Sequence, residues 1–165
     1  MLEKDYKIPE LDKWLKENPD QIKSAKKEKK DLIELEENFE PASFDIENLE
    51  YTEIDDQFSY KSNGIQTKIL EKLKKNKKNE FDCVEDLHGL TKRQAKTKLD
   101  NVIKEAIRRK YKKIKIIFGK GHHSPGMSEL IKVVTSYCIK SKHIKVACSA
   151  KKNDGGIGVI YIQLV

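Results

Sequence analysis

The order of apolar segments after residue 80 is the feature that most constrains how this chain folds. Two short β-rich runs, Phe81–Val84 and Ile114–Phe118, are separated by a segment with helical spacing. A second helical segment and two more apolar runs, at 144–148 and 157–164, complete the order β-α-β-α-β-β. This order predicts an α/β fold, a two-layer sandwich with a four-stranded mixed sheet, preceded by a helical or disordered N-terminal extension.

Residues typical of helix N-termini precede both predicted helices of this domain. Thr91 and Gln94 form a capping box, and apolar residues follow at helical spacing. Ser124 is placed to cap the second helix, with Pro125 at its first position. The last run, 157–164, is apolar almost throughout, which predicts a central strand.

Charge divides the chain into parts of opposite sign. The net charge is +7, yet residues 1–60 hold 9 Lys/Arg against 18 Asp/Glu, while residues 61–165 hold 25 against 9. We therefore expect an acidic extension at 1–60, a basic helical linker at 61–79 and a domain at 80–165. In the extension, 20–39 has a helical pattern and 42–60 has the composition of a disordered arm that docks on a partner.

The basic domain predicts a polyanionic partner, nucleic acid first and an anionic membrane surface second. The alternative is that the lysines serve only solubility. Cys83, Cys138 and Cys148 are odd in number and lie in apolar stretches, which predicts buried free thiols. With no run of transmembrane length and no signal-peptide core at the start, the expectation is a cytoplasmic protein without a membrane partner.

Asp86 and His88 are the strongest candidates for chemistry. They lie two apart at the end of a predicted strand, so their side chains are expected on one face. Such a pair can act as a base and its orienting group, or it can hold a divalent ion such as Mg²⁺ together with Asp82 or Glu85. No other cofactor is expected. A strand-end hydrogen bond without chemistry is the plain alternative.

A second motif, Gly119-Lys120-Gly121, follows the strand at 114–118. Glycines let the backbone approach a phosphate, and lysine supplies charge, although the same residues also suit an ordinary strand-to-helix turn. Loops after successive parallel strands meet at one sheet edge, so both motifs are expected to line one cleft. The residues predicted to contact nucleic acid are Lys92, Arg93, Gly119, Lys120, Gly121, His122, Gly155 and Gly156.

Three segments in order, 85–89, 118–121 and 154–158, resemble the hallmarks of the Smr (small MutS-related) domain. The resemblance covers about residues 80–165, and residues 64–73 resemble the stretch before the domain in stand-alone bacterial Smr proteins. It implies a two-layer α/β sandwich and an association with nucleic-acid nicking or cleavage. Two positions depart from the family: Glu85 replaces the usual Leu, and Phe118 replaces a frequent His or Thr that can serve catalysis or substrate contact.

The resemblance further implies an endonuclease that cuts mRNA at stalled or collided ribosomes, with the N-terminal extension holding the ribosome. RNA is preferred over DNA because its 2′-hydroxyl is a built-in nucleophile. In this hypothesis His88 is the general base or acid and Asp86 orients it, while Lys120 and the amides of Gly119 and Gly121 stabilise the phosphorane. A non-catalytic nucleic-acid or ribosome-binding module and a DNA-nicking enzyme of repair or recombination are the alternatives.

Overall fold

The computed structural model divides the chain into two compact units, Met1–Phe39 and Glu40–Val165. In the first, helix α2 spans Pro19–Asn38, close to the predicted 20–39. Proline suits a first helical position, and Asp20 in the first turn complements the helix dipole. No helix among the described residues is both long and apolar enough to cross a bilayer. The residues that the structure describes are 13–14, 16–49, 57–76, 80–119 and 129–165.

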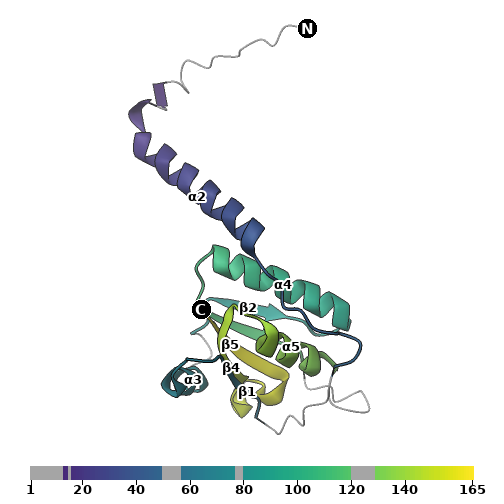
Figure 1. The fold of residues 1–165 in the computed structure, drawn as a ribbon. Helices are drawn as coiled ribbons and strands as arrows, with labels where there is room; N and C mark the ends of the chain where they lie inside the picture. The colour runs from purple at the N-terminus through teal and green to yellow at the C-terminus, as the bar shows by residue number, and fades with distance from the viewer. Residues whose placement is uncertain (1–12, 15, 50–56, 77–79, 120–128) are drawn as a thin grey trace. The chain divides into compact units, whose positions relative to one another are not determined.

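A mixed sheet in the order β1-β4-β5-β3-β2 forms the centre of the second unit (Figure 1). The α/β class is confirmed. β2 and β3 are parallel, whereas β5 runs antiparallel to both β3 and β4. The apolar run near the C-terminus is therefore the central strand, as predicted. The strands are β1 (Ser59–Lys61), β2 (Cys83–Asp86), β3 (Lys113–Ile117), β4 (Ile144–Ser149) and β5 (Val159–Leu164).

The sheet has five strands in place of the predicted four. The additional strand, β1, pairs antiparallel with the outer side of β4, with Ser59 opposite Cys148 and Lys61 opposite Val146. It is only three residues long, and its first two residues belong to the segment 42–60 that suggested a disordered arm. Its pairing depends on a partner far along the chain, so local sequence patterns gave no sign of it.

Helices cover both faces of the sheet. α4 (Lys92–Arg108) begins with the predicted capping box, and α5 is described over Glu129–Lys140; the predicted cap at Ser124 and Pro125 lies outside the described residues. The Tyr137 hydroxyl donates to Asp100 at 2.8 Å and joins the two helices. Figure 1 shows α3 (Thr67–Lys74) apart from this pair, across the sheet.

α3 makes the segment before residue 80 part of the same compact unit. Its Leu70 and Leu73 pack in one cluster with Val146, Cys148 and Tyr161 from the sheet. The compact unit therefore begins at Glu40, upstream of the predicted domain start at 80. A short helix that buries two leucines against strands is more than a linker, because that burial ties it to the sheet.

Residues 40–49 also belong to this unit and pack against it. Ala42 is buried, and the Phe44 ring meets Tyr137 edge to face with centroids 6.3 Å apart. Glu47 accepts hydrogen bonds from the guanidinium of Arg93. This described part of the acidic segment therefore docks on its own domain, where the sequence suggested a disordered arm.

The three cysteines are free, as predicted. Cys138 and Cys148 are buried and Cys83 is half-buried. Burial raises the pKa of Cys148 to about 12, with smaller opposing effects from the charges of Lys74 and Glu71. The Cys148 thiol is therefore protonated at neutral pH and is not a nucleophile.

Candidate functional site

Both predicted motifs and the glycine-rich turn lie at one edge of the sheet. β2, β3 and β4 end there, and β5 begins there, since Ile117 pairs with Val159 and Ser149 with Ile160. The carboxyl ends of parallel strands are where open α/β sheets bind ligands. The expected meeting of the two motifs at one edge is thus seen for the residues that are described.

Backbone hydrogen bonds join the three segments. The Leu87 N–H donates to the Ile117 carbonyl at 2.7 Å, linking the first motif to the end of β3. The N–H groups of Phe118 and Gly119 both donate to the Gly158 carbonyl, at 3.0 and 3.1 Å. The positions of the motifs relative to one another are therefore fixed by main-chain bonds.

Asp86 and His88 form a hydrogen-bonded dyad at the end of β2. His88 Nδ1 lies 2.8 Å from Asp86 Oδ1, and the His88 backbone N–H donates to the same oxygen at 2.9 Å. The side chain of His88 is 76% exposed. A carboxylate against Nδ1 favours the tautomer with a proton on Nδ1, which leaves Nε2 as an acceptor open to solvent.

The environment keeps Asp86 ionised. Partial burial raises the pKa of Asp86, but the backbone N–H and ring of His88, with the charge of Lys98, together lower it below its usual range. Lys98 also donates to the Asp86 carbonyl at 2.8 Å. Sequence reasoning missed Lys98, because only the packing of α4 beside β2 brings it to the dyad.

Gly89 lets the chain turn directly after the dyad. Its φ is 75°, in the left-handed region, and the Leu90 N–H closes the turn on the Leu87 carbonyl at 3.1 Å. A Cβ at Gly89 meets no atom within 4 Å, so conformation alone requires glycine. The turn leads into Thr91, the N-cap of α4.

The second motif differs from expectation in its first two residues. Phe118 is 3% exposed and belongs to the core, so position 118 presents no side chain to a substrate. The Gly119 amide is already bonded to Gly158, so it is not available to stabilise a phosphorane as predicted. Lys120, Gly121 and His122 lie outside the described residues.

Backbone geometry accounts for the glycines of the third segment. Gly155 has φ 103°, and a Cβ there falls 2.4 Å from Cγ2 of Val159. Gly156 also has a positive φ, of 58°. The turn thus has two glycines because of its own conformation, and their predicted contact with nucleic acid remains a prediction.

A buried polar triad holds this turn in place. The Asp154 carboxylate binds the ammonium of Lys115 with one oxygen and the hydroxyl of Tyr161 with the other. Lys115 and Tyr161 are paired neighbours on β3 and β5, and both are nearly inaccessible. Burial, together with the hydrogen bond to Asp154, raises the pKa of Tyr161. The turn is therefore tied to the middle of the sheet.

Lys92 and Arg93, both predicted to contact nucleic acid, bind carboxylates of their own chain. Lys92 Nζ lies 3.0 Å from Glu129 Oε2, and Arg93 Nη2 lies 2.8 Å from Glu47 Oε1. Exposed ion pairs of this kind stabilise a fold by at most about 1 kcal/mol. A phosphate can therefore displace either carboxylate, and the predicted contacts stay predictions.

The described carboxylates do not fit a magnesium site at the dyad. Asp82 accepts hydrogen bonds from the amides of Lys112 and Lys113, at the other end of β2. Glu85 pairs with Lys98 at 3.3 Å. Within the described ranges, no three His, Cys, Asp or Glu side chains come together as ligands. No catalytic step is therefore assigned to a metal.

Comparison with known proteins identifies the domain. Residues 85–165 match the sequence model of the Smr domain family. An uncharacterised protein of Treponema pallidum (strain Nichols) is 35% identical over 79 residues, which are 48% of this chain and 39% of that protein. The matched segment thus spans well under half of that relative.

Two solved structures align with this chain. YdaL, a stand-alone small MutS-related protein from Escherichia coli, aligns with TM-score 0.54 and 19% identity, over 71% of this chain and 93% of its own. The Smr domain of Thermus thermophilus MutS2 aligns with TM-score 0.46 and 24% identity, over 50% of this chain and 96% of its own. YdaL is covered almost completely, which agrees with a fold that begins upstream of residue 80.

Proposed function

Because residues 85–165 form an Smr domain, a nuclease-associated nucleic-acid-binding fold, we propose that this protein is an endonuclease that cleaves RNA. The observation that carries the proposal is the dyad. Asp86 holds one ring nitrogen of His88, and the other faces solvent. The dyad lies at the sheet edge where the three segments that resemble the Smr domain meet. This is the arrangement of a general base with its orienting carboxylate.

The proposed reaction uses the 2′-hydroxyl of the substrate. Nε2 of His88 takes the hydroxyl proton while the 2′-oxygen forms a bond to the adjacent phosphorus. The bond from phosphorus to the 5′-oxygen breaks, and that oxygen takes a proton from solvent, leaving a cyclic 2′,3′-phosphate. Asp86 stabilises the imidazolium that forms. Lys120 is the proposed partner of the charge that develops on the non-bridging oxygens.

Substitution of His88 tests this mechanism. His88→Ala is expected to lower RNA cleavage by about 10²–10⁴-fold, the usual size of general acid–base catalysis, with RNA affinity largely kept. Added imidazole should restore part of the rate. His143→Ala, at the opposite sheet edge, serves as the control. Wild-type cleavage rates in His88→Ala would contradict the proposal.

Two further experiments separate RNA cleavage from DNA nicking and from binding without cleavage. A single 2′-deoxy substitution at the scissile position should abolish cleavage; persistent cleavage favours a DNA-nicking enzyme. Activity should survive a chelator, since the described carboxylates do not assemble a metal site. RNA binding without any scission would favour the non-catalytic module, for which the buried Phe118 is the specific support.

We also propose that the substrate is mRNA on stalled or collided ribosomes, in the cytoplasm, with the N-terminal extension as the ribosome contact. The support is the similarity to stand-alone Smr proteins and, for the compartment, three free thiols. The structure determines how to truncate the chain. Removing 1–39 leaves the compact unit whole, whereas removing 1–60 also deletes most of β1 and the packed segment 40–49. Unchanged ribosome binding after removal of 1–39 would contradict this contact.

A further inference from the structure

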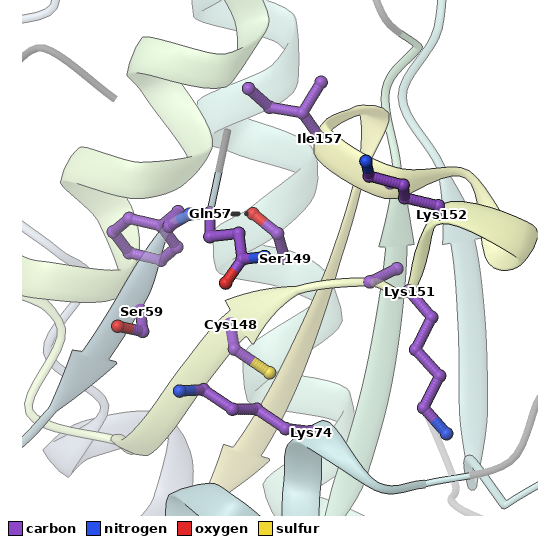
Figure 2. Close-up of a pocket in the computed structure, with 11 residues that line it drawn as sticks. Gln57, Ser59, Lys74, Cys148, Ser149, Lys151, Lys152 and Ile157 are labelled. Carbon is purple, nitrogen blue, oxygen red and sulfur yellow. Dashed lines mark hydrogen bonds between the residues drawn. The ribbon is translucent and has the colours of Figure 1, made fainter. Parts of the chain in front are cut away.

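A basic cavity lies at the same sheet edge as the dyad, beyond the glycine turn. It has a volume of about 500 Å³, within the range of small-molecule sites. Its walls come from the start of β1, the end of α3, the end of β4 and the turn before β5 (Figure 2). Gly156 and Ile157 line the cavity, and the same turn carries the Gly158 carbonyl that holds Phe118 and Gly119.

The described charged side chains that line this cavity are all lysines, and one of them, Lys74, also pairs with the exposed carboxylate of Glu71 at 3.3 Å. Lys74, Lys151 and Lys152 line it, and no Asp or Glu is among its described lining residues. Figure 2 shows Lys74 and Lys152 on opposite sides of the strand end that carries Cys148 and Ser149. Lys151 is held by a bond to the Lys75 carbonyl at 3.0 Å. The nearby Asp154 carboxylate binds Lys115 and Tyr161.

The remaining walls suit a nucleotide. Ser149 Oγ accepts the Phe58 N–H at 3.0 Å, and a hydroxyl that accepts one bond keeps its proton for another acceptor. The half-buried Phe58 ring is aromatic, the kind of side chain on which bases stack, and Ile157 adds apolar surface. The Cys148 thiol in the wall has a pKa raised by burial to about 12. The lining can thus bind a nucleotide, and its thiol stays protonated at neutral pH.

We propose that this cavity binds one nucleotide of the RNA strand, away from the bond that is cut, with Lys74 and Lys152 on its phosphate. The proposal rests on the function proposed above and adds a second contact point for the same substrate. β4 and β2 are three strand spacings apart, roughly 14 Å at about 4.8 Å each. An RNA strand bound along this edge of the sheet reaches both the dyad and the cavity. A dinucleotide, which has a single phosphodiester, does not reach both.

Salt dependence of binding measures these phosphate contacts. The probe is a 2′-O-methyl oligouridylate of about ten nucleotides, which has no free 2′-hydroxyl to attack, titrated with the full chain by fluorescence anisotropy. Each phosphate of a single strand that the protein neutralises contributes about 0.7 to the slope of log K against log salt. Lys74→Gln/Lys152→Gln removes the contact with one phosphate and should therefore lower the slope by about 0.7. The control, Lys112→Gln/Lys140→Gln, removes equal charge from exposed positions at the opposite edge.

The outcomes separate the two proposals. An unchanged slope in the cavity variant, or an equal drop in the control, overturns the cavity site even if RNA is cut. Tight binding with the expected slopes, but no scission of ordinary RNA, supports the cavity and contradicts the catalysis. If adenosine monophosphate binds as tightly as the oligomer, the cavity is a site for free nucleotides and the proposal that it binds an RNA strand is overturned. Melting temperatures of the variants confirm folding.

Discussion

One oxygen of Asp86, Oδ1, accepts hydrogen bonds from both the ring Nδ1 and the backbone N–H of His88, at 2.8 and 2.9 Å. The two bonds fix the ring relative to its own main chain. The imidazole is thus positioned before any substrate arrives, although it is largely exposed. Such preorganisation is what an acid–base group at a surface needs.

Removing the orienting carboxylate tests this arrangement. Asp86→Ala should lower kcat for RNA cleavage by roughly 10²-fold and leave KM nearly unchanged, because Asp86 acts through His88. Glu85→Gln is the matched control, since the neighbouring Glu85 carboxylate pairs with Lys98 at 3.3 Å. A rise in KM at constant kcat would instead indicate that Asp86 acts in substrate binding.

Three glycines with positive φ allow a graded test of the turns. Gly64 and Gly89 have φ of 76° and 75° with open space around a Cβ, so alanine at either should cost about 1–2 kcal/mol of stability. Only Gly89→Ala should also reduce cleavage, since it follows His88. Gly155→Ala adds a clash with Val159 and should cost about 1–3 kcal/mol more. If Gly64→Ala and Gly89→Ala lose equal activity, the loss comes from reduced stability and not from the turn that follows His88.

In the buried triad, we expect loss of one charge to destabilise the fold far more than loss of both charges. Asp154→Ala leaves the ammonium of Lys115 buried without its carboxylate and should cost about 3–5 kcal/mol in urea unfolding. The double variant Lys115→Met/Asp154→Leu should recover much of this loss, because it removes both charges. If the double variant is as unstable as the single, the cost arises from the turn and not from the charge.

Acid should destabilise the fold through paired carboxylates. Hydrogen bonds from Arg108 and Arg109 lower the pKa of Glu105 to about 2, and Lys92 and Lys132 lower that of Glu129. A depressed folded-state pKa gives stability that is complete above the unfolded value, about 4.3, and is lost as pH falls toward 2. Glu105→Gln should therefore lower the melting temperature at pH 7 but by less near pH 2.5. A constant difference across this range would contradict the prediction.

Local sequence patterns predicted those helices and strands that have a capping motif or an apolar run of their own. The capping box at Thr91 and Gln94 marked α4, and the apolar run at 157–164 marked the central strand. The spacing of two also predicted that Asp86 and His88 lie close together, but they do so for another reason than strand alternation. His88 lies in the turn after β2, where its backbone N–H donates to Asp86 Oδ1.

Features that depend on residues far apart in the chain could not be predicted from local sequence patterns. β1 has three residues and exists through β4. Arg93 looked like a free cation, yet its partner Glu47 is 46 residues away. Lys115 is a polar residue inside a buried strand, explained only by Asp154 from a later turn. In the basic cavity, Lys74 comes from α3 and lies far along the chain from Lys151 and Lys152, so no single sequence motif predicted the cavity.

The short strand β1 has a consequence for the solubility of the protein. It covers the outer side of β4, whose N–H and C=O groups would otherwise form an open row beside the apolar Val146, Ala147 and Cys148. Such a row is a template for pairing with another chain. Three residues at Ser59–Lys61, ending in a lysine, thus protect the sheet from edge-to-edge aggregation, and fragments that begin after residue 61 should self-associate where the longer chain does not.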